Sequence, residues 1–194
     1  SKTNFDVVDL GKAMSGKRAA LDVYIGTLYE GMSGFSVPKD FETLLQLINL
    51  NFTSIRQDDT SYESFMNRVE GILENRESRP EIIFQDAVNS ALYNDHFRSL
   101  PLTVPRLPEI SMDDAYNIYM ERFNNPGDFT FIFAGNIPDN FRLLVEIYIA
   151  SIPGTELIES WADREMYIED EVESIEVYAG IEPKSSVNIL FRGD

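Results

Sequence analysis

The chain contains no cysteine and only one histidine among its 194 residues. These two residue types are the usual protein ligands of transition metals, and histidine is the one side chain whose ordinary pKa lies close to neutral pH. The lack of cysteine excludes disulfide bonds, and a single imidazole, on His96, excludes any zinc site that needs two histidines. The absence of cysteine does not identify the cellular compartment, because both exported bacterial proteins and many cytosolic proteins lack cysteine.

Positive charge is also scarce. Sixteen basic residues face 33 acidic ones, which gives a net charge of −17 and predicts no nucleic-acid partner and no attraction to anionic membranes. No apolar run reaches the roughly 18 to 20 residues needed to cross a bilayer, and residues 1–30 lack the order of a secretory signal. We therefore expect a soluble chain without membrane insertion. Its hydrophobic share of 43% is sufficient for a core of ordinary size.

Apolar residues recur at spacings of three and four along much of the chain, which is typical of amphipathic helices. The spacing predicts helices within residues 5–14, 38–52, 58–73, 81–92, 111–123 and 138–149. Ser111 is expected to cap the fifth of these helices, with Ala115, Ile118, Tyr119 and Phe123 on its buried side. Residues 94–110 contain several prolines and little periodicity, so an irregular crossing segment is expected there.

Strand patterns are fewer. Alternation over residues 20–25 and a second extended run over 28–36 predict a hairpin with a tight turn near Gly26. Residues 129–134 are apolar on both faces, which predicts a central strand. After Gly154 an acidic linker follows over residues 155–177, and 174–179 with 186–191 are candidates for a strand pair. Together the patterns indicate an α+β fold, with an antiparallel-rich sheet covered on one face by several helices.

Several segments, in this order, resemble the insulinase/pitrilysin-type zinc peptidases, in their bacterial branch. The segments that match best are Glu30-Gly-Met-Ser-Gly-Phe-Ser36, Pro38-Lys-Asp-Phe-Glu-Thr-Leu-Leu-Gln-Leu47, residues 53–56, Asn75-Arg-Glu77 with Pro80, Arg122-Phe123, Gly127-Asp-Phe-Thr-Phe-Ile-Phe-Ala-Gly-Asn136 and Tyr148-Ile-Ala-Ser-Ile-Pro153. The resemblance extends over roughly residues 5–155 and lies in the combination, since each short string alone is weakly specific.

The resemblance implies a mitochondrial-processing-peptidase-like metallohydrolase domain. Members of that family build two halves from four homologous α+β domains that enclose a peptide, and the zinc motif H-x-x-E-H lies in the first domain. This chain is similar to the first domain of the second half, which lacks the motif. We therefore expect a non-catalytic domain at residues 1–153 without its first strands, and an acidic linker and the start of the next domain at 154–194.

The implied partners are the other domains of the same peptidase and a peptide substrate. The zinc and the proteolysis would belong to the parent hydrolase, a metallopeptidase, and no cofactor is expected in this fragment. Bacterial relatives suggest a periplasmic or cell-envelope location. A sheet edge and an apolar patch are expected to be exposed where neighbouring domains are missing. The alternative is a stand-alone interaction or scaffold module with the same fold and no activity.

Candidate sites within the chain are weak. His96, with Asp95 beside it, is more simply a loop histidine bonded to backbone or water than a metal ligand. Glu63, Glu70, Glu74 and Glu77 lie on one helix opposite its apolar stripe, so a solvated face is favoured over paired carboxylate catalysis. No G-x-S-x-G motif is present to indicate a nucleophilic serine.

The remaining candidate is the stretch Ser33, Gly34, Phe35 and Ser36. Gly31-Met-Ser-Gly34 is no phosphate loop, because it lacks the lysine and lies within a predicted strand. By resemblance, residues 33–36 are expected to line the peptide chamber. The alternative is a glycine-containing edge strand in which side-chain bulk is simply absent.

Overall fold

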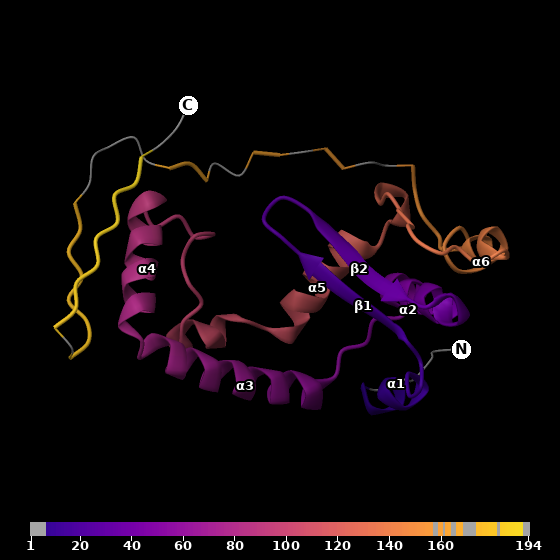
Figure 1. Cartoon of the computed structure of the whole chain (residues 1–194), viewed down its shortest axis with the longest axis horizontal. Coiled ribbons are helices and arrows are strands. Elements are labelled where there is room, and N and C mark those ends of the chain that lie inside the picture. Colours follow the sequence, from indigo (N-terminus) through magenta and orange to yellow (C-terminus); the bar gives the residue numbers. More distant parts are fainter. Residues whose placement is uncertain are drawn as a thin grey trace. The chain divides into compact units, whose positions relative to one another are not determined.

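The computed structural model describes residues 7–156, 159–160, 162–163, 166–168, 174–181 and 183–191. It divides the chain into two compact units, each built from two separate stretches of sequence. Unit 1 comprises residues 1–61 and 112–160, and unit 2 comprises residues 62–111 and 161–194. The described residues form helices and a two-stranded antiparallel sheet (Figure 1), which confirms a mixed α+β fold.

Unit 1 contains the sheet. Its elements are α1 (Val7–Ala13), β1 (Ala19–Ile25), β2 (Glu30–Ser36), the 3-10 helix η1 (Pro38–Asp40), α2 (Phe41–Thr53), α5 (Met112–Phe123), the 3-10 helix η3 (Pro126–Asp128) and α6 (Phe141–Tyr148). The hairpin expected around Gly26 is confirmed, since β1 and β2 pair antiparallel and the Gly26 N–H donates to the Tyr29 carbonyl at 2.9 Å.

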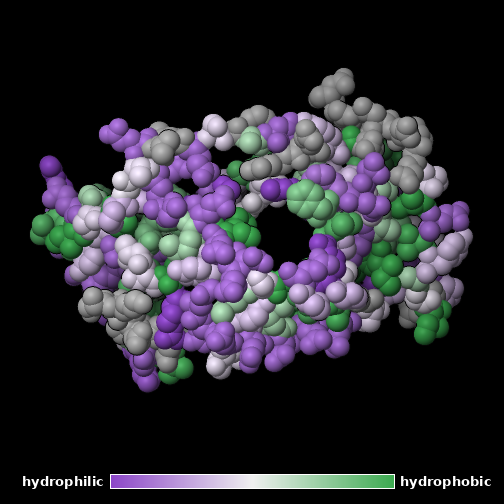
Figure 2. Space-filling model, turned by 180° about the vertical axis from the view of Figure 1, so that it is seen from behind, coloured by the Kyte–Doolittle hydropathy of each residue, from purple (hydrophilic) through white to green (hydrophobic). Residues whose placement is uncertain are grey.

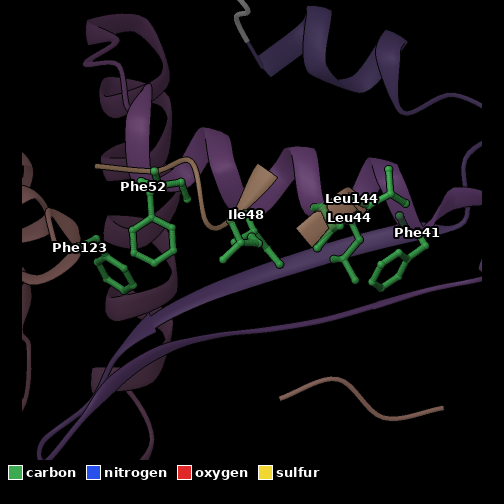
Figure 3. Close-up of a cluster of buried hydrophobic side chains, with 10 residues drawn as sticks. Phe41, Leu44, Ile48, Phe52, Phe123 and Leu144 are labelled. Atoms are coloured by element: carbon green, nitrogen blue, oxygen red, sulfur yellow. The ribbon is translucent and has the colours of Figure 1, made fainter. Parts of the chain in front are cut away.

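Helix α2 provides five of the ten buried residues in the core cluster of unit 1. Its apolar residues at spacings of three and four are buried: Phe41, Leu44, Leu45, Ile48 and Phe52. Figure 3 shows Leu44 and Ile48 pointing from α2 toward the hairpin, and Phe52 meeting Phe123 of α5. Because burying one such side chain stabilises a fold by about 1.5–3 kcal/mol, this helix face holds the hairpin in place.

Two polar connections fix the elements around α2. The Asp40 carboxylate is buried, accepts the Arg18 N–H at 2.9 Å and pairs with Lys17 at 3.7 Å, so it ties the start of β1 to the start of α2. On α6, the Tyr148 carbonyl accepts a hydrogen bond from the Asn49 side chain at 2.8 Å, and the Tyr148 hydroxyl donates to Glu42 at 2.6 Å. A buried carboxylate needs such partners, because an unpaired one is costly to remove from water.

The fifth predicted helix forms as α5, but it buries fewer of its apolar residues than their spacing predicted. Tyr119 stacks on Phe123 with ring centroids 4.7 Å apart, and its hydroxyl donates to the Asn51 carbonyl at 3.0 Å. Ala115 and Ile118, which were expected on the buried side, are exposed. The ring stack and the hydrogen bond therefore fix the rotation of the helix. The sixth predicted helix also forms, although α6 begins at Phe141 rather than at residue 138.

The predicted central strand at residues 129–134 is wrong for the described structure, in which the segment is unpaired and assigned to no strand. Its side chains nevertheless alternate as in a strand. Phe129, Phe131 and Phe133 are partly buried against the core, and the residues between them are exposed. A strand forms only when it pairs with a neighbouring strand. The sequence pattern indicates that a segment favours an extended conformation, but it does not identify a partner strand.

Unit 2 contains most of α3 (Asp59–Glu77), with α4 (Pro80–Leu92) and the 3-10 helix η2 (Val104–Glu109). The helices were predicted, whereas η2 lies in the segment that was expected to be irregular. Among the described residues of this unit, only Leu73, Val88 and Leu107 form buried apolar positions. Phe65 and Ile72, which were expected on the apolar face of α3, are more than half exposed.

The strand pair expected at 174–179 and 186–191 does not form in the described residues. This stretch contacts the start of α4, where Lys184 pairs with Glu81 at 2.8 Å. Its large apolar residues are mostly exposed, among them Tyr178, Ile181, Val187, Ile189 and Phe191. Because little apolar area is buried there, little free energy is available to fix two strands in register. On the face shown in Figure 2, apolar residues form several groups among hydrophilic residues.

Candidate functional site

The hairpin has one face packed on the core and one face pointing outward. Leu21, Val23 and Met32 pack against the core. Because successive residues of a strand point to opposite faces, their neighbours point away from it. We call this the outward face, and it consists of three cross-strand pairs: Ala20 with Phe35, Asp22 with Ser33, and Tyr24 with Gly31.

The four residues expected to line a peptide chamber divide between the two faces. Ser33 and Phe35 lie on the outward face and are exposed. Gly34 and Ser36 lie on the inward face, opposite Leu21 and Ala19. The four candidates therefore do not share one face, although Gly34 is exposed as well and Ser36 is half-buried.

Aromatic side chains dominate the outward face. Phe35 is 65% exposed and Tyr24 is 43% exposed, although both are large apolar residues. The Tyr24 side chain lies over Gly31, since a Cβ atom at Gly31 would be 2.6 Å from the Tyr24 hydroxyl oxygen. The Tyr24 ring also packs edge-on against the Tyr29 ring, with centroids 6.0 Å apart. Rings held in this way lose little entropy on binding, so they suit an apolar contact surface.

Hydrogen-bonding groups accompany these rings. The Ser33 hydroxyl and the Asp22 carboxylate face each other across the strands, between the pair formed by Tyr24 and Gly31 and the pair formed by Ala20 and Phe35. A hydroxyl can donate and accept, and a carboxylate accepts. The outward face can contact a ligand that has both apolar and polar groups. Its residues do not assemble a general base, an activated nucleophile or a set of metal ligands for bond cleavage.

Gly34 explains why the hairpin sits so close to α2. A Cβ atom at this position would lie 2.7 Å from the Ala20 carbonyl oxygen and 2.9 Å from Leu44 Cδ1. Real Cβ atoms do not approach backbone so closely, so glycine is required for this packing. This favours the structural interpretation of Gly34 over a role in lining a chamber.

His96 is a loop histidine, as its context indicated. Its Nδ1 atom accepts the Arg98 N–H at 3.2 Å, and its ring packs on Phe97 with centroids 4.7 Å apart. The neighbouring Asp95 accepts a hydrogen bond from the Ser90 hydroxyl. Within the described ranges, no three histidine or acidic residues lie close enough together to hold a metal ion.

The acidic row on α3 is a solvated face at the positions whose side chains are described. Glu63, Glu70 and Glu74 are exposed, and Glu77 lies outside the residues with described side chains. Exposed carboxylates along a helix are the expected surface of such an acidic chain.

Unit 2 has a pocket of about 340 Å³ beside α4. Its lining residues are Asp86, Ala87, Ser90, Leu100, Pro101, Thr103 and Arg106. The charged groups in it are already paired, since Asp86 binds Arg76 at 2.6 Å and Arg106 donates to the Pro101 carbonyl at 3.2 Å. Charged groups that are already paired give no sign of an activated acid, base or nucleophile.

The pKa shifts in the described residues have local structural causes. The Ser61 N–H, donated to Asp58 at the start of α3, lowers the pKa of that carboxyl group, and Lys184 lowers the pKa of Glu81. Burial raises the pKa of Tyr119 to about 12. A hydrogen bond to Glu176 raises the pKa of Tyr178. None of these groups lines the pocket or the outward face.

Reasoning from the sequence missed Asp22 and Tyr24 as members of the surface. The signal was available, because they alternate with Leu21, Val23 and Ile25 in β1 and must therefore face away from the core. The cross-strand register, which places them opposite Ser33 and Gly31, could not be derived from one strand.

No known family model matches the chain, and no curated protein matches it either. No helix in the described parts of the chain is long and apolar enough to cross a membrane.

Proposed function

We propose that this chain is a non-catalytic, peptide-binding domain of a zinc metallopeptidase, and that its outward face contacts extended substrate. The bond cleavage would occur at a zinc site in another domain of the same protein. The sequence resemblance supports the family. The observation on which the site rests is that Phe35 and Tyr24 stay exposed on a hairpin whose other face packs against the core.

The chemistry of the outward face suits an extended polypeptide. Phe35 and the Tyr24 ring offer apolar contact, and Ser33 and Asp22 lie between them as hydrogen-bonding groups. An extended peptide presents side chains and backbone groups at a similar period, so it can satisfy both kinds of contact at once. The excess of acidic residues favours peptides that contain lysine or arginine.

Binding of a fluorescently labelled, lysine-containing extended peptide tests the proposal. We expect Phe35→Ala to weaken binding about tenfold or more, as loss of an aromatic anchor does. The control is Phe65→Ala, which removes another phenylalanine that is 51% exposed, on α3. Equal binding by the two variants, or no binding by the unaltered chain, would contradict the proposed site.

The complete gene tests the family assignment separately. We expect an H-x-x-E-H motif upstream of these residues, on a domain that would hold the zinc. If the complete gene lacks it, the stand-alone interaction module becomes the better description. Peptide binding at the outward face would then still need its own explanation.

A further inference from the structure

Asp22 is the charged residue of the outward face. It is exposed, and among the described residues its carboxylate has no ion-pair or hydrogen-bond partner. Between Arg18 and Lys39 the chain contains two acidic residues, Asp22 and Glu30, and no basic residue. Glu30 lies on the other face of the hairpin, opposite Ile25. The Asp22 carboxylate can therefore pair with a cation that a ligand brings to this face.

Two aromatic side chains flank this carboxylate along the hairpin. Tyr24 lies two positions after Asp22 on β1, and Phe35 lies in the next cross-strand pair on the other side, opposite Ala20. Each ring faces a small residue, since the Tyr24 side chain lies over Gly31. Successive pairs on one face of a strand are about 7 Å apart. The outward face therefore presents a ring, a carboxylate and a second ring at regular intervals.

A basic side chain suits the position between the two rings. Lysine and arginine have an apolar stem that packs on apolar surface and a charged end that stays in contact with polar groups. The stem would contact the rings of Tyr24 and Phe35, which also attract a cation placed over their faces. The charged end would meet the Asp22 carboxylate, and the Ser33 hydroxyl opposite it offers a further oxygen.

We infer that Asp22 binds the lysine or arginine side chain of an extended peptide that has apolar residues two positions before and two positions after the basic one. The spacing follows from the hairpin, because an extended peptide laid along it presents alternate side chains at the same period. The inference rests on the proposed function and adds the order of residues in the substrate. Attraction by the net charge of −17 does not depend on that order.

Two labelled peptides of identical composition provide the test. The first has leucine, serine, lysine, serine and leucine at its centre, with glycines at both ends. The second exchanges the lysine with the serine before it, so that the lysine side chain points away from the hairpin when the leucines contact the rings. Both have the same charge, so long-range attraction is equal. We expect the unaltered chain to bind the first peptide about fivefold more tightly than the second.

Asp22→Asn examines the carboxylate itself. This variant removes one charge from an exposed side chain of nearly the same shape, and the two peptides are expected to bind it within about twofold of each other. The matched control is Glu63→Gln, which removes one charge from an exposed position on α3 and should keep the fivefold difference. The inference is overturned if the unaltered chain binds both peptides equally, if Asp22→Asn keeps the difference, or if Glu63→Gln loses it as well.

Phe35→Ala separates failure of this inference from failure of the proposed function. If the two peptides bind the unaltered chain equally but Phe35→Ala weakens both, the outward face binds peptide and the role of Asp22 is wrong. If neither peptide binds the unaltered chain, the proposed function and the inference are both overturned. A preference for the first peptide that only Asp22→Asn and Phe35→Ala reduce supports both.

Discussion

At the residue scale, individual side chains set how closely the hairpin approaches α2 and how the helices around it are fixed. The buried Asp40 carboxylate shows the principle, because it is stabilised by the Arg18 N–H and by Lys17. Gly34 and Tyr119 are two further positions where one atom group decides local packing, and each leads to a prediction.

Gly34→Ala is expected to destabilise unit 1. The added methyl group would lie 2.7 Å from the Ala20 carbonyl oxygen, so the hairpin must shift, at a cost of about 1–3 kcal/mol in the free energy of unfolding. Gly11→Ala in α1 is the control, since a Cβ atom there meets nothing within 4 Å and alanine favours helix. Urea unfolding of both variants measures the difference. Equal stability of the two would contradict the account of the hairpin packing.

Tyr119→Phe is expected to change how stability depends on alkaline pH. Burial raises the pKa of Tyr119 to about 12, so the folded state keeps the phenol proton more tightly than the unfolded chain, whose pKa is about 10. This stabilisation is fully present below pH 10 and is lost as the pH rises from about 10 to 12. Below that range the variant loses only the hydrogen bond to the Asn51 carbonyl, about 1 kcal/mol.

Urea unfolding at a series of pH values measures this dependence. The original chain should be the more stable of the two below pH 10, and this difference in unfolding free energy should shrink and then reverse in sign between pH 10 and 12. Tyr29→Phe, at an exposed tyrosine, is the control and should show no such convergence. A difference that stays constant over this range would contradict the effect of burial on Tyr119.

At the element scale, helices were predictable and strands only partly so. The spacing of Phe41, Leu44 and Ile48 defines both the helix and its buried face, because a helix satisfies its own backbone. The hairpin was also predictable, since Gly26 marks a local turn. The segment at 129–134 could not be judged in this way, because a strand depends on a partner that local sequence does not reveal.

The candidate site was predictable to a similar degree. Ser33 and Phe35 are exposed, and whether they bind peptide stays a prediction. Gly34 and Ser36 were grouped with them through the family resemblance, whereas strand geometry places neighbouring residues on opposite faces. Asp22 and Tyr24 belong to the outward face because the register of β1 against β2 places them opposite Ser33 and Gly31. That register is a property of the folded hairpin.

An ion pair joins helices α3 and α4. We expect it to contribute more to the free energy of unfolding than the ion pairs on the surface do. Arg76 and Asp86 lie 2.6 Å apart, and both are mostly shielded from solvent. We expect Asp86→Ala to cost about 1–3 kcal/mol in unfolding free energy, because it leaves a partly buried guanidinium group with fewer partners. Urea unfolding followed by NMR signals of unit 2 measures the effect.

Lys184→Ala is the matched control for this prediction. It breaks the Lys184–Glu81 pair, in which both side chains are largely exposed, and should leave stability unchanged within error. Equal losses in the two variants would show that burial does not distinguish these pairs.

At the scale of the whole molecule, the chain has surfaces for binding and no assembled group for catalysis among its described residues. The pocket in unit 2 has paired charges, His96 is occupied by a backbone N–H, and the outward face has aromatic rings and hydrogen-bonding groups. Under the proposed function, such a domain would contribute to proteolysis by holding substrate. Its acidic charge would attract basic peptides and repel acidic ones.

NMR mapping of a bound peptide tests the central claim most directly. An isotope-labelled chain is titrated with a lysine-containing extended peptide in the presence of zinc, and the peptide is then recovered and weighed by mass spectrometry. The account predicts shifts in the amide signals of Asp22, Tyr24, Ser33 and Phe35, with the peptide recovered intact. Shifts confined to the pocket of unit 2, or recovery of a cleaved peptide, would contradict it.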